Sequence, residues 1–225
     1  MMKIFALVPV KKFERSKSRL GSVLSTDERI KLSELLLINT ISILKKSSAI
    51  SNIVVISSDN VAKEIAATSD TKFLEEPKDN GVNAAITLAD DYSFENKAHA
   101  TLVIPVDLPL LTCTDVNIMC KYSKSLERCV VICPSLRYDG SNALLRKPSR
   151  LLKTHYDEDS FNAHIRAATL FRIPIKVFLS QRIMKDLDSI EDIKILMNER
   201  ITNPPIDYLK SKLRTSLLTS DPTIN

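Results

Sequence analysis

The chain is poor in the residues that mark several common ligand-binding motifs. Of its 225 residues only three are glycine and none is tryptophan. No GxGxxG or GxxxxGK(S/T) segment is present, which leaves a dinucleotide fingerprint and a P-loop unsupported. A phosphate site in this chain must therefore depend on side-chain cations more than on a glycine-rich backbone.

Cysteine and long apolar runs are also scarce. The four cysteines form no CxxC pair and have no histidine at zinc-finger spacing, so no structural zinc site is indicated. Cys129 and Cys133 lie in the apolar run CVVIC, where we expect buried thiols in a reducing compartment. No apolar run approaches the roughly 20 residues of a membrane span, and the first residues lack a signal-peptide cleavage site. We expect a cytoplasmic protein without a membrane partner.

The positive charge of the chain is not accompanied by aromatic residues. The net charge is +5 and the sequence pI is about 9.0, but aromatic residues make up only 5% of the chain. Basic surfaces that bind single-stranded nucleic acid usually carry stacking side chains between the cations, and the basic segment described below has none. We therefore expect no nucleic-acid partner and favour a small anion as the ligand.

Apolar runs alternate with amphipathic stretches along the chain. The runs at 52–58, 100–106 and 129–134 are almost entirely apolar, as strands buried on both faces of a parallel sheet should be. This alternation predicts an α/β, Rossmann-like domain with a mainly parallel central sheet flanked by helices. The expected strands are 3–10, 52–58, 71–74, 100–106, 129–134, 142–146 and 174–179.

The helices between these strands begin at recognisable caps. Ser25 with Glu28 fits a capping box before a helix over 29–46, and Asp59 precedes a helix over 61–68. Gly81 leads into a helix over 82–92, and Asp115 is expected to cap one over 116–126. The caps therefore support the same alternating order.

The division of the chain follows from the same pattern. We expect one domain over 1–203, with the less regular stretch 134–178 as an insertion that covers one sheet edge on the substrate side. Pro204 and Pro205 are expected to end the globular pattern and leave 204–225 as a terminal helix and tail. Exposed faces of the insertion or of the tail could pair two subunits in a homodimer.

Five cations follow the first expected strand within nine positions. Lys11, Lys12, Arg15, Lys17 and Arg19 account for nearly all of the net charge. Loops that leave the carboxyl ends of parallel strands bind ligands in α/β proteins, so this segment predicts a site for an anion such as a polyphosphate. The alternative interpretation is a solvated surface run.

Two acidic positions could hold a metal ion beside these cations. Asp107 follows a buried strand directly, although it could instead form an Asx turn. Asp186 and Asp188 flank Leu187 and share a face if the segment is extended, although Asp188 or Ser189 could instead cap the helix that follows. Since Mg²⁺ is usually held by one or two carboxylates plus substrate phosphates, Asp107 and Asp188 predict a magnesium–triphosphate site.

Four segments together carry a resemblance to a known family. They are VKKFERSKSRL at the start, the NA pair in GVNAAI, the strand end PVDLPLL and the later DLDSIEDI. The chain resembles nucleotidyltransferases with the nucleotide-diphospho-sugar transferase fold, and more closely the 2-phospho-L-lactate guanylyltransferase family. Within that family the pattern VKxxxxxKSRL is distinctive. The segments Gly140-Ser141-Asn142 and DEDSFNAH, residues 157–164, are similar to two further family motifs, and the resemblance covers about residues 1–200.

The resemblance implies an activity and roles for particular residues. The expected reaction transfers GMP from GTP to 2-phospho-L-lactate, releases pyrophosphate and belongs to coenzyme F-420 biosynthesis. The alternatives are another phosphorylated acceptor, such as phosphoenolpyruvate or a sugar phosphate, and a non-catalytic nucleotide-binding regulator. The implied residues are Lys11, Lys17, Arg19 and Asp107 for catalysis; Lys11, Lys17, Arg19 and Asn83 for the nucleotide; Ser141, Asn142 and Ser160 for the acceptor; and Asp107 and Asp188 for Mg²⁺.

Some positions keep two interpretations. Asn83 could recognise a base, as the resemblance implies, or cap a helix, as its position indicates. His164 could bind phosphate or face the core, and a lone histidine on a helix more often does the latter. Asp157 stands where the family usually has glycine, and a carboxylate there would repel an anionic acceptor unless it points away.

Overall fold

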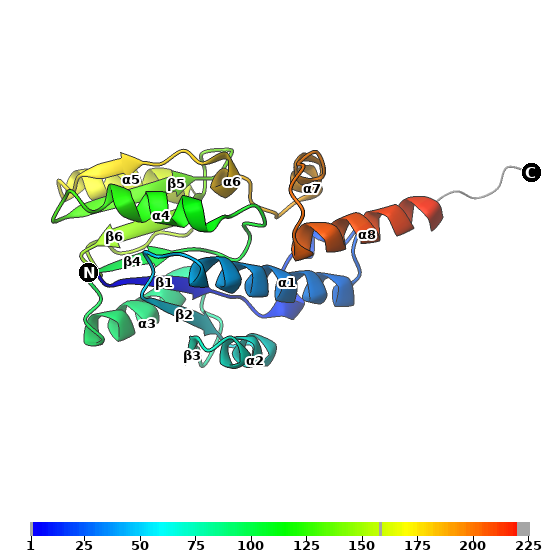
Figure 1. Cartoon of the computed structure of the whole chain (residues 1–225), viewed down its shortest axis with the longest axis horizontal. Coiled ribbons are helices and arrows are strands. Elements are labelled where there is room, and N and C mark those ends of the chain that lie inside the picture. The colour runs from blue at the N-terminus through cyan, green and yellow to red at the C-terminus, as the bar shows by residue number, and fades with distance from the viewer. Residues whose placement is uncertain (1, 158, 220–225) are drawn as a thin grey trace, which may run out of the picture.

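The computed structural model describes residues 2–157 and 159–219. Seven strands form one sheet in the order β3-β2-β1-β4-β6-β5-β7 (Figure 1). This sheet confirms the predicted α/β architecture. The strands are β1 (Ile4–Pro9), β2 (Asn52–Ser57), β3 (Lys72–Glu75), β4 (Ala100–Val103), β5 (Cys129–Pro134), β6 (Ser141–Lys147) and β7 (Ile175–Val177).

Strand order reverses at the centre of the sheet. β1 pairs in parallel with β2 on one side and with β4 on the other, with Leu7 opposite both Val54 and Val103. The chain moves outward from β1 to β2 and β3, then returns to β4. In open α/β sheets ligands bind at the carboxyl ends of the strands on either side of such a reversal. The segments after β1 and β4 are therefore placed at the topological switch point.

The stretch 134–178 differs from its prediction as an insertion over one edge. β6 lies inside the sheet, antiparallel to both β4 and β5, and only β7 lies at the edge. Ala143, Leu144 and Leu145 are all fully buried, as an interior strand requires. Strand β6 was expected from its apolar residues. Its position between β4 and β5 was not expected, because nothing in the local sequence indicates which strands it pairs with.

The helices begin where most of the predicted caps place them. Ser25 and Glu28 form the expected capping box, and the Asp59 carboxylate accepts from the first backbone amides of its helix. Asp115 is not the cap of its helix: Thr112 is the cap, and Asp115 is the third helical residue, which completes a capping box. The helices are α1 (Thr26–Lys45), α2 (Asn60–Thr68), α3 (Val82–Glu95), α4 (Cys113–Tyr122), α5 (Ser160–Leu170), α6 (Gln181–Met184), α7 (Ile190–Met197) and α8 (Pro204–Thr219).

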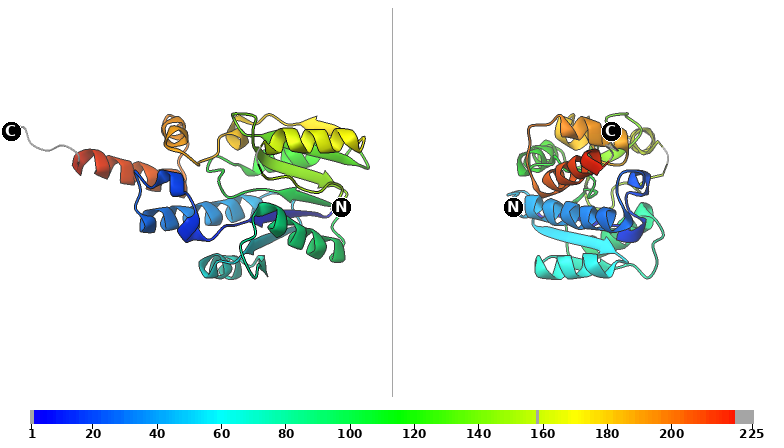
Figure 2. Two further views of the ribbon diagram at one scale, coloured as in Figure 1. Left: turned by 180° about the vertical axis from the view of Figure 1, so that it is seen from behind. Right: turned by 90° about the vertical axis from the view of Figure 1, so that its right-hand side faces the viewer.

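Alternate residues of β1 enter two separate hydrophobic cores. Ile4, Ala6 and Val8 pack in the core beneath α1 and α4, whereas Phe5 and Leu7 pack in the core beneath α3 and α5. This is the period of two expected of a strand that is covered on both faces. The two helical layers lie on opposite sides of the sheet in Figures 1 and 2.

The C-terminal part of the chain joins the body rather than leaving it at Pro204. Ile206 and Leu209 are fully buried in the core beneath α1, so the globular pattern extends beyond the two prolines. Pro204 starts α8, as a proline in the first turn of a helix can. The far end of α8 projects away from the sheet (Figure 2). Residues 220–225, predicted as tail, lie outside the described residues.

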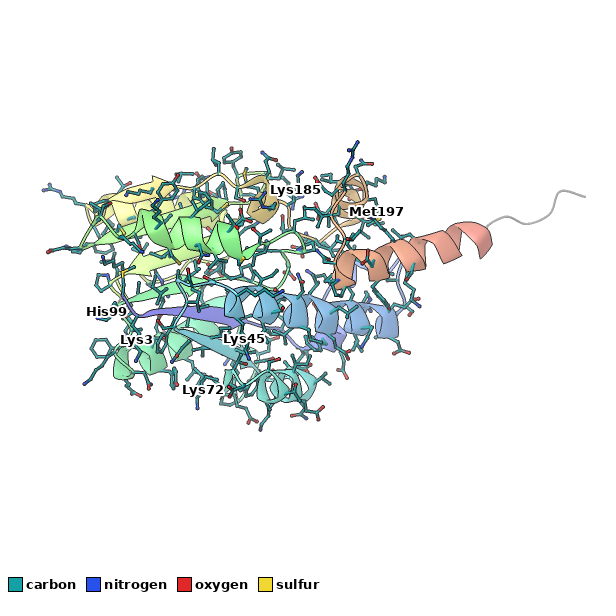
Figure 3. All side chains as sticks on the ribbon, viewed as in Figure 1. Lys3, Lys45, Lys72, His99, Lys185 and Met197 are labelled. Atoms are coloured by element: carbon teal, nitrogen blue, oxygen red, sulfur yellow. The ribbon has the colours of Figure 1, made fainter. Side chains whose placement is uncertain are left out.

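Several residues without a functional context have structural roles. Cys129 and Cys133 are buried free thiols, as predicted, and burial raises the pKa of Cys133 to about 11. His99 accepts the backbone N–H of Lys3 at 2.8 Å, and the two residues are neighbours near the N-terminus in Figure 3. No helix in the described part of the chain is both long and apolar enough to cross a bilayer.

Candidate functional site

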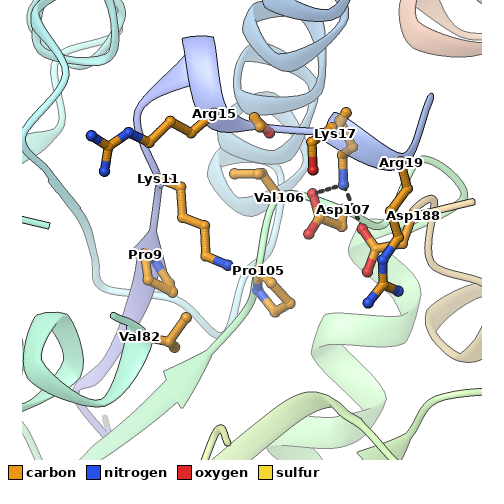
Figure 4. Close-up of a pocket in the computed structure, with 12 residues that line it drawn as sticks. Pro9, Lys11, Arg15, Lys17, Arg19, Val82, Pro105, Val106, Asp107 and Asp188 are labelled. Carbon is orange, nitrogen blue, oxygen red and sulfur yellow. Dashed lines mark hydrogen bonds and ion pairs between the residues drawn. The ribbon is translucent and has the colours of Figure 1, made fainter. Parts of the chain in front are cut away.

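The basic segment after β1 lines a cleft at the switch point. Two 3-10 turns, Phe13–Arg15 and Ser18–Leu20, fold the segment back, and the buried side chains of Phe13 and Leu20 anchor it. The cap of α2, Asp59, also accepts the backbone N–H of Phe13 at 2.9 Å. The cleft holds about 370 Å³ (Figure 4). We call it the cationic cleft; its charged lining is Lys11, Arg15, Lys17, Arg19, Asp107 and Asp188.

Lys17 is the cation that joins the two acids of this cleft. Its ammonium group contacts the Asp107 carboxylate and lies 2.9 Å from Oδ1 of Asp188, while its side chain is only 3% exposed. Burial lowers the pKa of Lys17, but the two carboxylates raise it by more, so the net shift is upward and the amine stays charged. The backbone of Lys17 is left-handed, with φ of 53°, which is an uncommon conformation for a lysine.

Asp107 and Asp188 come from distant parts of the chain and meet through backbone as well as side chain. The N–H of Leu187 donates to the C=O of Asp107 at 2.9 Å, and Leu187 is fully buried. Ser189 caps α7 with Asp192, so Asp188 is not the cap and its carboxylate is available to Lys17. The predicted meeting of the basic segment with these two acids is therefore present.

A second cleft adjoins the first and has the opposite charge. The acidic cleft holds about 440 Å³ and shares Pro105, Asp107 and Asp188 with the cationic cleft. Burial, and secondarily the charge of Asp188, raise the pKa of Asp186 to about 6. Arg137 is the one cation among the described residues of this lining. The acids of the cleft are Asp107, Asp139, Asp157, Asp159, Asp186 and Asp188.

Two serines of the acidic cleft each accept a hydrogen bond from the protein. The N–H of Ser141 donates to Oγ of Ser160 at 2.8 Å. The N–H of His155 donates to Nε2 of His164 at 2.9 Å, so the neutral imidazole carries its proton on Nδ1, 2.9 Å from Oγ of Ser141. Oγ of Ser141 is therefore an acceptor in this contact. Both hydroxyl hydrogens remain available for an anion in the cleft.

Asn142, a predicted ligand of the acceptor, uses its side-chain N–H groups to bind the protein backbone. The amide of Asn142 donates to the C=O groups of Ile183 and Met184 at 2.9 and 3.3 Å, which holds the segment that leads to Asp186 and Asp188. Asn142 thus lines the acidic cleft and fixes the position of the segment that follows Met184.

Asn83 does not line the cationic cleft. Its Oδ1 accepts the N–H of Tyr156 at 2.8 Å, and its Nδ2 donates to Oδ2 of Asp157 at 3.1 Å. The cap of α3 is Gly81 instead, at a φ of 86° that favours glycine. Asn83 thus connects α3 to the rim of the acidic cleft and engages one oxygen of Asp157. Neither interpretation from the sequence, base recognition or helix capping, describes these contacts.

The donor set fits a magnesium ion that is shared with phosphate oxygens. In the described part of the chain no three histidine, cysteine or acidic side chains form a metal site by themselves. Asp107 and Asp188, however, already converge on one positive group, the Lys17 ammonium. Two hard oxygen donors at the mouth of a cleft for anions suit Mg²⁺ completed by substrate phosphates and water.

His164 makes the stability of the fold depend on pH. Burial, and secondarily the charge of His155, lower the pKa of His164 to about 4. The unfolded chain takes up this proton near pH 6.5 and the folded chain does not, so stability falls as the pH falls from about 6.5 to 4, by up to about 3 kcal/mol. Urea unfolding of wild type and His164→Gln across this range should show a flatter pH dependence for the variant. Parallel curves would contradict the assignment.

Comparisons with known proteins identify the family of the chain. The sequence profile of a family described as "Guanylyl transferase CofC like" matches residues 2–221. The chain is 32% identical over 192 residues to a phosphoenolpyruvate guanylyltransferase of Rubrobacter xylanophilus, covering 85% of this chain and 92% of that protein. It is 28% identical over 190 residues to a 2-phospho-L-lactate guanylyltransferase of Methanobrevibacter smithii, covering 84% and 82%.

The fold has relatives among solved structures. A structure from Desulfovibrio desulfuricans, described under the nucleotide-diphospho-sugar transferases, superposes with a TM-score of 0.77 at 14% identity. The superposition covers 96% of this chain and 98% of that one. At this identity the likeness concerns the fold alone, and it confirms the fold type that the sequence motifs had indicated.

Proposed function

The chain belongs to the CofC-like guanylyl transferase family, and on that premise we propose that it transfers GMP from GTP to 2-phospho-L-lactate and releases pyrophosphate. The observation that carries this proposal is the junction of the two clefts. Asp107, Asp188 and Lys17 stand where a cleft rich in cations meets a cleft with paired serine donors. One cleft suits a triphosphate and the other a smaller phosphorylated acid.

The reaction needs alignment more than proton transfer. An oxygen of the acceptor phosphate attacks the α-phosphorus of GTP, and the bond from that phosphorus to the bridging oxygen of pyrophosphate breaks. A phosphate monoester has its second pKa near ~6, so at neutral pH it is already a nucleophile and requires no general base. His164 is buried and has both ring nitrogens engaged, which agrees with a mechanism that uses no histidine base.

The residues of the two clefts have complementary tasks in this mechanism. Lys17 binds the triphosphate near the reacting phosphorus, and Lys11 and Arg19 neutralise the charge that develops on the departing pyrophosphate. The hydroxyls of Ser141 and Ser160 donate to the acceptor phosphate. Asp107 and Asp188 would hold Mg²⁺, which neutralises charge on the reacting phosphate oxygens when it is bound.

The names of the relatives favour a second acceptor, phosphoenolpyruvate. It and phospholactate are both three-carbon acids with a phosphate on the second carbon, so one cleft can take either. Arg137 lies 3.5 Å from Asp139 and 3.6 Å from Asp192, beyond ordinary hydrogen-bond length. Its guanidinium group is the cation of the acidic cleft placed to meet the carboxylate of such an acid.

The test is a screen of purified protein for pyrophosphate release. The four common nucleoside triphosphates are combined with 2-phospho-L-lactate, phosphoenolpyruvate and a hexose phosphate, with Mg²⁺ present. We expect release with GTP and one or both of the carboxylic acids. Turnover confined to the hexose phosphate, or tight GTP binding without release for any acceptor, would refute the proposal.

Arg19 should strengthen GTP binding through long-range attraction between its charge and the triphosphate. Its side chain is exposed in the cationic cleft, so Arg19→Ala should weaken GTP binding several-fold at low salt, and high salt should largely remove the difference because ions screen exposed charges. Lys12→Ala is the control, since Lys12 is exposed but does not line the cleft. Titration calorimetry at two ionic strengths checks this. Equal losses for both variants would indicate a general charge effect.

A further inference from the structure

A small recess opens from the cationic cleft at the end opposite the paired acids. It shares Pro9, Lys11 and Val82 with the cleft and is closed by the segment that follows β3, including Glu76 and Asp79. Its volume is about 20 Å³, roughly enough for one polar group and too small for a whole ring. Only the edge of a planar ligand could enter it, with the rest of the ligand in the cleft.

Glu76 is the unusual residue of this recess. Glu76 is only 8% exposed, yet its carboxylate has no hydrogen-bond or ion-pair partner within residues 2–157 and 159–219. The neighbouring acids are occupied, because Glu75 pairs with Lys63 and Asp79 accepts the N–H of Gly81. The Glu76 oxygens are not among the fully closed-off polar atoms of the described residues, so a ligand in the recess can reach them. A largely buried carboxylate without protein donors is costly, and a ligand that supplies the donors lowers this cost.

The position of the recess fits one part of a nucleotide. Figure 4 places Pro9 and Val82 at one side of the cationic cleft, and Lys17, Asp107 and Asp188 at the other. A triphosphate at the Lys17 side therefore directs its nucleoside toward Pro9 and Val82. These two apolar side chains can contact the faces of a base, whose edge then points into the recess.

We propose that Glu76 selects the base by accepting hydrogen bonds from N1–H and the 2-amino group of guanine. This inference rests on the proposed function and adds the residue that makes GTP the substrate. A carboxylate offers only acceptors, and this edge of guanine offers two adjacent donors. Adenine presents a lone pair at N1, which the carboxylate would repel. Burial, and secondarily the charge of Asp79, raise the pKa of Glu76, because no hydrogen-bond donor of the protein stabilises the charged form.

Three binding measurements test this role. Wild-type protein should bind ITP, which lacks the 2-amino group, about tenfold more weakly than GTP. Glu76→Gln should bind GTP about ten- to a hundredfold more weakly and ATP no worse than wild type does. The same variant should gain affinity for XTP, because an amide can donate to the 2-oxo group that replaces the amino group. A residue with a purely structural role would not produce that gain.

The control is Glu75→Gln, which changes the exposed acid next to Glu76 and should leave all four affinities unchanged. Equal wild-type affinities for GTP and ITP would overturn the role of Glu76 without any variant. Unchanged discrimination between GTP and ATP in Glu76→Gln would overturn it as well. Absence of GTP binding by the wild type would instead refute the proposed function, so the two failures are distinguishable.

Discussion

Asp107→Asn should lower the rate of pyrophosphate release by about a hundredfold or more. The substitution keeps the shape of the side chain and removes one of the two negative charges at the junction of the clefts. The amide is a weaker ligand for Mg²⁺ than the carboxylate, and it no longer pairs with Lys17. The Asp107 side chain is 31% exposed, so loss of this charge should not unfold the protein.

The measurement is steady-state pyrophosphate release with GTP and phospholactate, together with circular dichroism to verify the fold. Asp139→Asn is a suitable control, because Asp139 lines the acidic cleft but is hydrogen-bonded to Ser135 away from Lys17. The control should retain most of the activity. A rate for Asp107→Asn within threefold of wild type would remove Asp107 from the mechanism.

Lys17→Met should damage both binding and stability. Loss of the ammonium group leaves Asp107 and Asp188 facing each other without a shared cation. Their side chains are 31% and 40% exposed, so we expect a loss of about 2 kcal/mol in the free energy of unfolding, between the values for exposed and fully buried pairs. GTP affinity should fall at high as well as low salt, because a side chain 3% exposed is poorly screened.

Urea unfolding and GTP titration at two ionic strengths check this prediction. Adding Mg²⁺ to Lys17→Met should recover part of the lost stability, since the divalent ion can replace the missing charge between the carboxylates. The exposed Lys12→Met serves as the matched control and should change neither quantity. If Lys17→Met has the same free energy of unfolding as wild type, the prediction is wrong and Lys17 is not needed to offset the repulsion between the two acids.

The sequence was most informative where a local pattern determines a local structure. Apolar runs located the strands, and the chemistry of Ser25, Asp59 and Ser189 located helix starts. The place of β6 between β4 and β5 could not be predicted, because strand order depends on long-range pairing that leaves no local pattern. Asp115 was misassigned for a related reason. A capping box contains two polar residues three positions apart, and only the structure shows which one is the cap.

The residues of the candidate site also fall into those that the sequence predicted and those that it did not. Lys11, Lys17, Arg19 and Asp107 follow strands, and Asp188 directly precedes the cap of α7, so their positions in the sequence led to their prediction. The contacts that Asn83 makes with Tyr156 and Asp157 were not predicted, because they join segments more than seventy positions apart. Glu76 carried no signal at all. In the sequence it is one of two adjacent glutamates, and only packing distinguishes the buried one from the exposed one.

The backbone hydrogen bond between Leu187 and Asp107 has a consequence for the protein during its synthesis. The sheet is complete once β7 has been made, but Asp188 follows β7 in the chain. A nascent chain halted at that point would have every strand and the whole basic segment, with Lys17 facing one carboxylate. Asp188 is thus added late in synthesis, together with the buried residues of α7 and α8. A product that ends at β7 would lack both the second carboxylate and part of the core.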